Sequence, residues 1–96
     1  MQIQPFRLVY RPFPADCGGM VPGLLSGAGG RLLIVIDSNQ DTETQARALR
    51  HELAHLVLNH LEDTERTIRE LEAEADMYAD QMTETEFSEL MKGAIV

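Results

Sequence analysis

The sequence predicts an α+β protein in which a small N-terminal antiparallel sheet or hairpin is followed by three helices. Two observations lead to this prediction. The first 40 positions hold β-branched and aromatic residues together with most of the glycines and prolines. After Asp41, apolar residues recur at intervals of three and four instead. With 96 residues, of which 44% are hydrophobic, the chain is expected to form a single domain, 1–96.

Strands are expected in the N-terminal part of the chain. Residues 3–10 are rich in strand-forming side chains, and the prolines at positions 5, 12 and 14 predict that this strand lies at an edge of the sheet. Glycines dominate residues 18–30, which predicts loop and turn with a short strand around 20–25. The apolar run 32–36 is then expected to be a buried strand and the second arm of a hairpin.

Three helices are expected after the strands. The spacing Thr-x-x-Gln at 42–45 is typical of a capping box and predicts a helix that runs to about residue 61. Thr-x-x-Glu at 67–70 marks the first turn of a second helix, which has Ile68 on its apolar face. The same spacing at 83–86 predicts a third, short helix.

Composition excludes several classes of function. Sixteen acidic residues against eight basic ones give a net charge of −8, which opposes direct binding to nucleic acid. The acidic second half is interpreted as a solvated helical surface, with DNA mimicry or a basic protein partner as the alternative. Cys17 is the single cysteine, so no intramolecular disulfide is expected and a reducing cytoplasm fits best. The sequence contains no apolar stretch of the roughly 18 residues that a membrane span needs, and no signal peptide is recognised.

The first predicted helix contains the motif His-Glu-Leu-Ala-His at residues 51–55. A helical spacing of four residues places His51 and His55 on one face with Cβ atoms about 5–6 Å apart, which suits two nitrogen ligands of one zinc ion. Glu52 projects beside them and is the candidate general base that activates a water molecule. The motif therefore predicts a zinc hydrolase site.

The third ligand has to come from another part of the chain. On a continuous helix His60 falls in the apolar stripe, roughly 140° from the two motif histidines at 100° per residue, so it is interpreted as a structural histidine. The metzincin pattern is excluded because Leu58 and Leu61 stand where that pattern has glycine and histidine.

A carboxylate of the second helix is the natural candidate for the third ligand. If the two helices form an antiparallel hairpin, residue 72 lies opposite His55 and residue 76 lies opposite His51. Glu72 is then the expected metal ligand, and Asp76 is expected to accept the free N–H of His51. Glu74 is the alternative ligand, since the register is good to about one residue. The simpler alternative is that these acids form a solvated helix face.

Three segments together resemble the ImmA/IrrE family of metallo-endopeptidases: residues 34–38, residues 47–60 around the His-Glu-x-x-His motif, and Glu-Ala-Glu-Ala-Asp-Met-Tyr-Ala at 72–79. The resemblance implies a minimal, gluzincin-like zincin fold, in which an edge strand lies over the metal and two helices carry the ligands.

The resemblance also implies roles for individual residues. His51, His55 and Glu72 correspond to zinc ligands, and Glu52 corresponds to the general base. Understood members of the family cleave a helix-turn-helix repressor, so the expected substrate is a cytoplasmic, DNA-binding protein. The alternative is a catalytically weak metal-binding module that acts by protein–protein contact. A second copy of the chain could complete the substrate cleft, and oxyanion stabilisation is left open between Tyr78, Tyr10 and Arg50.

Overall fold

The computed structural model describes residues 4–14, 23–27 and 31–95. Cys17 and the first part of the strand expected at 20–25 lie outside the described residues. Within the described part, four strands and three α-helices form an α+β arrangement, which confirms the predicted fold class. None of these helices is both long and apolar enough to cross a membrane.

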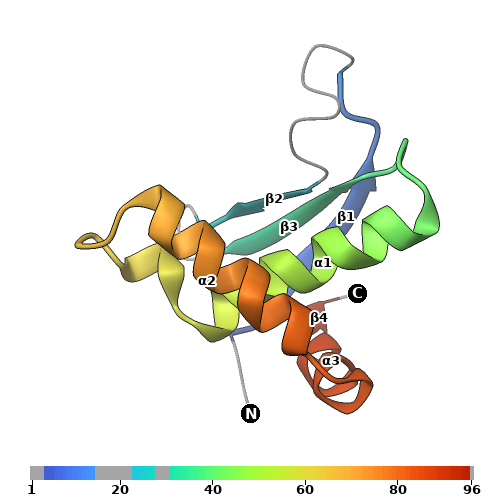
Figure 1. Ribbon diagram of the computed structural model, residues 1–96. Coiled ribbons are helices and arrows are strands. Elements are labelled where there is room, and N and C mark those ends of the chain that lie inside the picture. The colour runs from blue at the N-terminus through green and yellow to red at the C-terminus, as the bar shows by residue number, and fades with distance from the viewer. Residues whose placement is uncertain (1–3, 15–22, 28–30, 96) are drawn as a thin grey trace.

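The four strands form one mixed sheet. They are β1 (Phe6–Arg11), β2 (Gly23–Ser26), β3 (Leu32–Asp37) and β4 (Ala94–Ile95), in the spatial order β2-β3-β1-β4. β2 and β3 form the expected antiparallel hairpin, whereas β1 runs parallel to both β3 and β4. The sheet is therefore not wholly antiparallel. Its two parallel strand pairs, β1 with β3 and β1 with β4, join segments that are far apart in the sequence (Figure 1).

The prediction that the first strand lies at an edge is wrong. β1 is an inner strand, paired with β3 along its whole length and with β4 at Phe6 and Arg7. Proline disrupts a sheet only where its missing N–H is needed. Pro5, Pro12 and Pro14 all lie outside the strand, so its interior keeps a complete set of donors.

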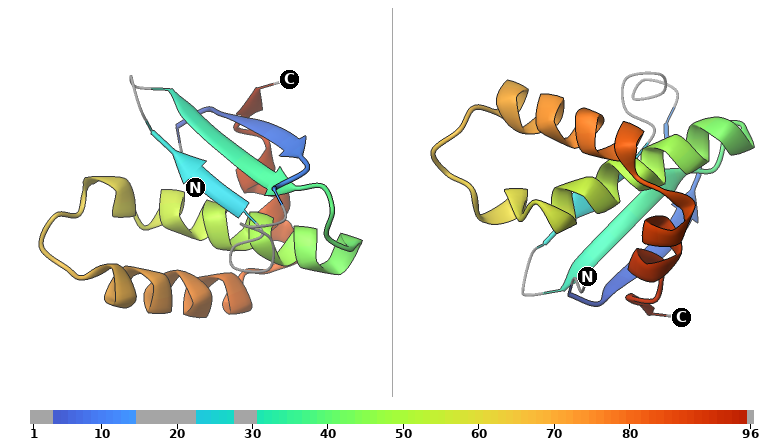
Figure 2. Two further views of the ribbon diagram at one scale, coloured as in Figure 1. Left: turned by 90° about the horizontal axis from the view of Figure 1, so that it is seen from above. Right: turned by 60° about the horizontal axis from the view of Figure 1, so that its bottom comes forward.

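Two of the three helices, the first and the second, form successive layers on one face of the sheet. The helices are α1 (Thr42–Val57), α2 (Ile68–Gln81) and α3 (Glu84–Met91), with a short 3₁₀ turn, η2 (His60–Glu62), after α1. α1 lies between the sheet and α2, and α2 runs antiparallel beside α1 (Figure 2). One face of α1 therefore meets the sheet while the opposite face meets α2.

The starts of α1 and α2 are capped in different ways. At the start of α1 the Gln45 side chain does not return to Thr42; it donates hydrogen bonds to the main-chain oxygens of Asp37 and Gln40. The capping box predicted there is therefore wrong. At the start of α2, Glu70 N donates to Thr67 Oγ1 and Thr67 N donates to Glu70 Oε1, which is a complete capping box.

The first helix ends earlier than predicted. α1 stops at Val57, and Asn59 adopts the left-handed conformation with φ 57°. Asparagine tolerates this conformation better than other non-glycine residues, so it ends helices as glycine does. The chain then turns back into η2, and His60 no longer follows the helical wheel of α1.

The core lies between the sheet and α1. Its fully buried large side chains include Phe6, Ile34, Ile36, Leu53 and Leu90. Ile68, expected on the apolar face of α2, is 78% exposed instead. α2 packs chiefly on α1, and its first turn extends beyond the core.

Leu53→Ala is expected to destabilise the protein by about 2–5 kcal/mol, because it leaves a cavity in the side of α1 that packs on the sheet. The matched control is Leu24→Ala, since Leu24 is 52% exposed and its truncation is expected to change stability by about 0.5 kcal/mol or less. Thermal or urea unfolding measures both variants. Equal losses of stability in the two variants would contradict this location of the core.

Candidate metal centre

The two histidines and the glutamate of the His-Glu-x-x-His motif lie outside the hydrophobic core. Leu53, inside the motif, packs into the core, while His51, Glu52 and His55 line a cavity formed with α2 and β2. Glu52 and His55 are only 8% and 9% exposed. Because both sides of α1 are covered, polar side chains of this helix are withdrawn from water without being part of the hydrophobic core.

Three ligand atoms converge at this place. Glu72 of α2 lies with Oε2 2.6 Å from His51 Nε2 and with Oε1 3.3 Å from His55 Nε2. The two imidazole Nε2 atoms are 3.1 Å apart. These three residues are the group of potential metal ligands found among the described residues. The structure therefore brings together the two histidines and the carboxylate that the sequence singled out.

The second nitrogen of each histidine already has a partner. His51 Nδ1 lies 2.8 Å from Asp76 Oδ1, and His55 Nδ1 lies 2.8 Å from Nδ1 of His60. If both Nδ1 atoms carry the proton, both Nε2 atoms present bare lone pairs to each other and to the Glu72 carboxylate. Burial also lowers the pKa of His55, which favours the neutral ring that a metal ligand requires.

This donor set fits a divalent cation. Three lone-pair donors that face one another without a proton between them repel, and a cation at their centre removes that repulsion. Zinc bonds of about 2.0–2.1 Å in tetrahedral geometry place ligand atoms about 3.3 Å apart. The Nε2–Nε2 separation of 3.1 Å and the His55–Glu72 separation of 3.3 Å are close to this value, while the His51–Glu72 separation of 2.6 Å is shorter. Two imidazoles and one carboxylate are also the ligand set of catalytic zinc sites that keep a fourth position open.

Glu52 is a buried carboxyl group beside the three donors. Burial, opposed by His51 and reinforced by Glu72, raises its pKa from 4.5 to about 7. A group with a pKa near the working pH is suited to accept a proton and give it back during one reaction cycle. The environment of Glu52 therefore matches the requirements of a general acid–base.

Glu52→Gln is expected to stabilise the metal-free protein at pH 8 but not at pH 4. A carboxyl group whose pKa is higher in the folded than in the unfolded state lowers the stability of the protein as the pH rises between the two pKa values. For Glu52 this range runs from 4.5 to about 7. Glutamine does not ionise, so the variant does not lose stability in this way. Melting temperatures of both proteins in the presence of a chelator test this. A difference between the proteins that does not change with pH would contradict it.

Glu74 and His60 do not occupy the places that the sequence suggested. Glu74, the alternative third ligand, lies with Oε1 2.6 Å from His60 Nε2 and also accepts two hydrogen bonds from Arg66, each 3.0 Å long. His60 is 5% exposed, as expected of a structural histidine, but it contacts His55 directly. The helical wheel placed it on the wrong side because α1 ends before it.

The cavity above the three donors has a volume of about 640 Å³. Arg47 lines it one helical turn before His51, while apolar lining comes from β2, η2 and the start of α2. The three candidates for oxyanion stabilisation are not among its lining residues. Tyr78 donates its hydroxyl proton to Glu86, Arg50 donates to the main-chain oxygen of Met82, and Tyr10 lies on β1.

Sequence reasoning missed two features of the site. The position of Arg47 in the cavity could have been predicted from the sequence, because residues four apart share a helix face and Arg47 precedes His51 by four residues. The contact between His55 and His60 depends on the left-handed Asn59. Asparagine after an apolar helical run signals a helix end, but it does not give the direction of the chain that follows.

Comparison with known proteins agrees with this geometry. Residues 4–95 match the model of a peptidase family described as the IrrE N-terminal-like domain. The match spans all described strands and helices, including every residue of the metal centre. No curated protein and no solved structure is similar enough to the chain to count as a match.

Proposed function

Because the chain belongs to the peptidase family of the IrrE N-terminal-like domain, we propose that it is a zinc-dependent metallo-endopeptidase. The observation that supports this best is the convergence of His51 Nε2, His55 Nε2 and a Glu72 carboxylate oxygen within 4.8 Å of one another. We assign these three atoms as the zinc ligands. Zinc is preferred for this mixed nitrogen and oxygen donor set, although other divalent ions also accept it.

The chain's own residues then have defined tasks. A zinc ion held there supplies a Lewis acid that lowers the pKa of water towards 7. Glu52 accepts the proton of the attacking water and passes it to the leaving amine. Asp76 accepts a hydrogen bond from the Nδ1–H of His51 and so orients that ring. Arg47 lines the same cavity, where its guanidinium can donate to a carbonyl oxygen of the substrate.

The proposed substrate is a cytoplasmic protein, and a helix-turn-helix repressor is the first to test. Two considerations support this choice. The sequence resembles endopeptidases that cleave such repressors, and a net charge of −8 attracts the basic surface of a DNA-binding protein. Binding of this protein to nucleic acid itself is not part of the proposal.

A second candidate function is a metal-binding regulatory module with weak or no turnover. One observation favours it: Tyr78, Tyr10 and Arg50 are all absent from the described lining of the cavity. A module of this kind would keep the three ligands and act by contacting its partner. A second copy of the chain that extends the substrate cleft is compatible with either function.

Metal content is the first test of the proposed function. The protein is purified without a metal-affinity step, and elemental analysis is expected to find about one zinc ion per chain. His55→Ala is expected to lose it. Incubation with candidate repressors, followed by mass spectrometry of the products and by a chelator control, then tests for cleavage. No metal on purification together with no uptake during zinc titration would rule out a metallopeptidase.

A further inference from the structure

His55 is connected to a charged surface turn through one buried imidazole. His55 Nδ1 lies 2.8 Å from His60 Nδ1, and His60 Nε2 lies 2.6 Å from Glu74 Oε1. The His60 side chain is only 3% exposed, whereas Glu74 is 41% exposed. These contacts form a continuous line from the surface of α2 to the metal centre.

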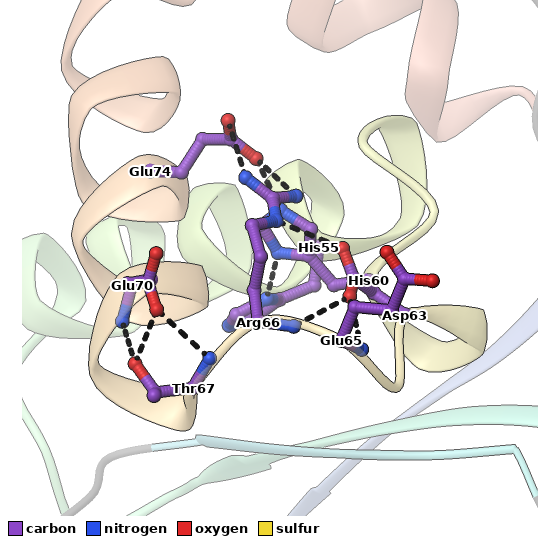
Figure 3. Close-up of polar contacts among 8 residues, drawn as sticks. All are labelled: His55, His60, Asp63, Glu65, Arg66, Thr67, Glu70 and Glu74. Atoms are coloured by element: carbon purple, nitrogen blue, oxygen red, sulfur yellow. Dashed lines mark hydrogen bonds and ion pairs between the residues drawn. The ribbon is translucent and has the colours of Figure 1, made fainter.

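The outer end of this line is anchored firmly (Figure 3). Arg66 donates two hydrogen bonds of 3.0 Å to the two carboxylate oxygens of Glu74. Its Nε donates to Asp63 Oδ2 at 2.8 Å, and Asp63 Oδ1 accepts from the main-chain N–H groups of Glu65 and Arg66. Bidentate arginine–carboxylate pairs fix geometry as well as charge, so the position of Glu74 is set by the turn before α2.

The contacts allow one arrangement of protons when both rings are neutral. Both carboxylate oxygens of Glu74 accept hydrogen bonds from Arg66, so Glu74 faces His60 as an acceptor. His60 must then carry its proton on Nε2 and accept through Nδ1. His55 has to donate from its own Nδ1, which leaves a lone pair on its Nε2.

We propose that His60 and Glu74 are positioning residues that hold the proton on Nδ1 of His55 and thereby direct its Nε2 lone pair to the metal. This inference rests on the proposed function, since it assigns His55 as a metal ligand. It explains why three acids alternate along α2. Glu72 meets both Nε2 atoms, Asp76 orients His51 directly, and Glu74 orients His55 through His60.

The two histidines are thus oriented in different ways. Asp76 is 73% exposed and touches His51 at the rim of the cavity, whereas His55 is oriented from inside through the buried ring. The inner route ties the metal centre to the connection between α1 and α2. Loss of the Glu74 contact should therefore weaken metal binding even though Glu74 does not touch the proposed ligand atoms.

The protonated ring nitrogens of the metal-free protein give a test that does not depend on zinc. Long-range ¹⁵N–¹H NMR correlations at about pH 8 are expected to show the proton of His55 on Nδ1 and that of His60 on Nε2. In Glu74→Ala the His60 ring is expected to lose its single tautomer. A His55 ring in the wild type that carries no proton on Nδ1 would overturn the proposal.

Zinc affinity, measured by competition with a chelator, is the second readout. Glu74→Ala and His60→Phe are expected to weaken binding about 10- to 100-fold, as loss of a partner behind a metal ligand typically does. His60→Asn is expected to restore most of the affinity of His60→Phe, because the asparagine Oδ1 can take the accepting position of Nδ1. Glu65→Ala, an exposed acid in the turn before α2, controls for lost charge and should bind zinc as the wild type does.

The outcomes separate this inference from the proposed function. Wild-type affinity in both Glu74→Ala and His60→Phe would overturn the positioning role while leaving the peptidase intact. Failure of the wild type to take up zinc would remove the proposed function, and the tautomers of the metal-free protein would still decide whether His60 and Glu74 control His55. Glu74→Ala alters a partly exposed side chain, so it remains informative if His60→Phe does not fold.

Discussion

Glu52→Gln is expected to lower the rate of peptide hydrolysis about 10²- to 10⁴-fold, the usual contribution of a general acid–base. Glutamine has nearly the shape of glutamate but cannot accept a proton from water. Because Glu52 is 8% exposed and lies beside the proposed ligands rather than among them, the substitution should leave zinc content unchanged. Single-turnover cleavage of an identified substrate, with zinc measured on the same sample, tests both parts.

The control for this variant is Glu43→Gln, the same chemical change in the exposed first turn of α1. It should hydrolyse the substrate at the wild-type rate. If Glu52→Gln retained full activity with bound zinc, Glu52 would not be the base. If it lost zinc as well, its effect on the rate could not be assigned to proton transfer, and the assignment of Glu52 as a base rather than a ligand would be contradicted.

The same variant separates the two candidate functions. A peptidase loses its biological effect when Glu52 is replaced, because the effect depends on product formation. A regulatory module keeps its effect, because metal and surface are both retained. Measuring the level of the intact partner protein in cells that carry each variant distinguishes these outcomes. If hydrolysis is the mechanism, the intact partner is lost with the wild type and persists with Glu52→Gln; for a regulatory module its level is the same with both proteins.

The positions of the motif residues could be predicted because they depend on local rules. Helical spacing puts His51 and His55 on one side of α1, and an antiparallel helix pair brings residues 72 and 76 opposite them. The structure has both contacts, His51 with Asp76 and His55 with Glu72. These relations need only the period of a helix and the place of one turn, and both are visible in the sequence.

The sheet was less predictable because its pairings are not local. β1 pairs in parallel with β3, and the last strand pairs with β1 from more than 80 residues away. A two-residue strand such as Ala94–Ile95 has no detectable period of its own. The prolines around β1 suggested an edge strand because prolines occur both at edges of sheets and at ends of strands. Their positions mark where this strand ends, but they do not show how many neighbouring strands it has.

The route through His60 could not be derived from sequence for a different reason. It requires the left-handed Asn59, the turn that follows, and a carboxylate that Arg66 holds in place. Each step is a side-chain or turn geometry that several sequences allow. A helical wheel assumes that the helix continues. Because Asn59 is not helical, His60 points in a different direction from the one that a continuous helix would give it.

Glu72→Ala is expected to have the largest effect on metal binding of any acidic substitution on α2. It removes the only carboxylate in the group of three converging donors, so the zinc affinity should fall by more than the roughly 10- to 100-fold that loss of an outer partner costs. Asp76→Ala should show the smaller effect, because Asp76 contacts His51 Nδ1 rather than Nε2. Chelator competition measures both affinities.

Thermal unfolding with and without zinc gives an independent measure of the same difference. A ligand that binds only the folded state stabilises it by about 2.7 kcal/mol at a free concentration 100 times its dissociation constant. The wild type should therefore melt at a higher temperature with zinc, and Glu72→Ala should show no such rise at the same zinc concentration. The control is Asp80→Ala, which alters an exposed acid of the same helix and should behave as the wild type. A full zinc-dependent rise in Glu72→Ala would mean that another group completes the site, and Glu72 would lose its assignment as the third ligand.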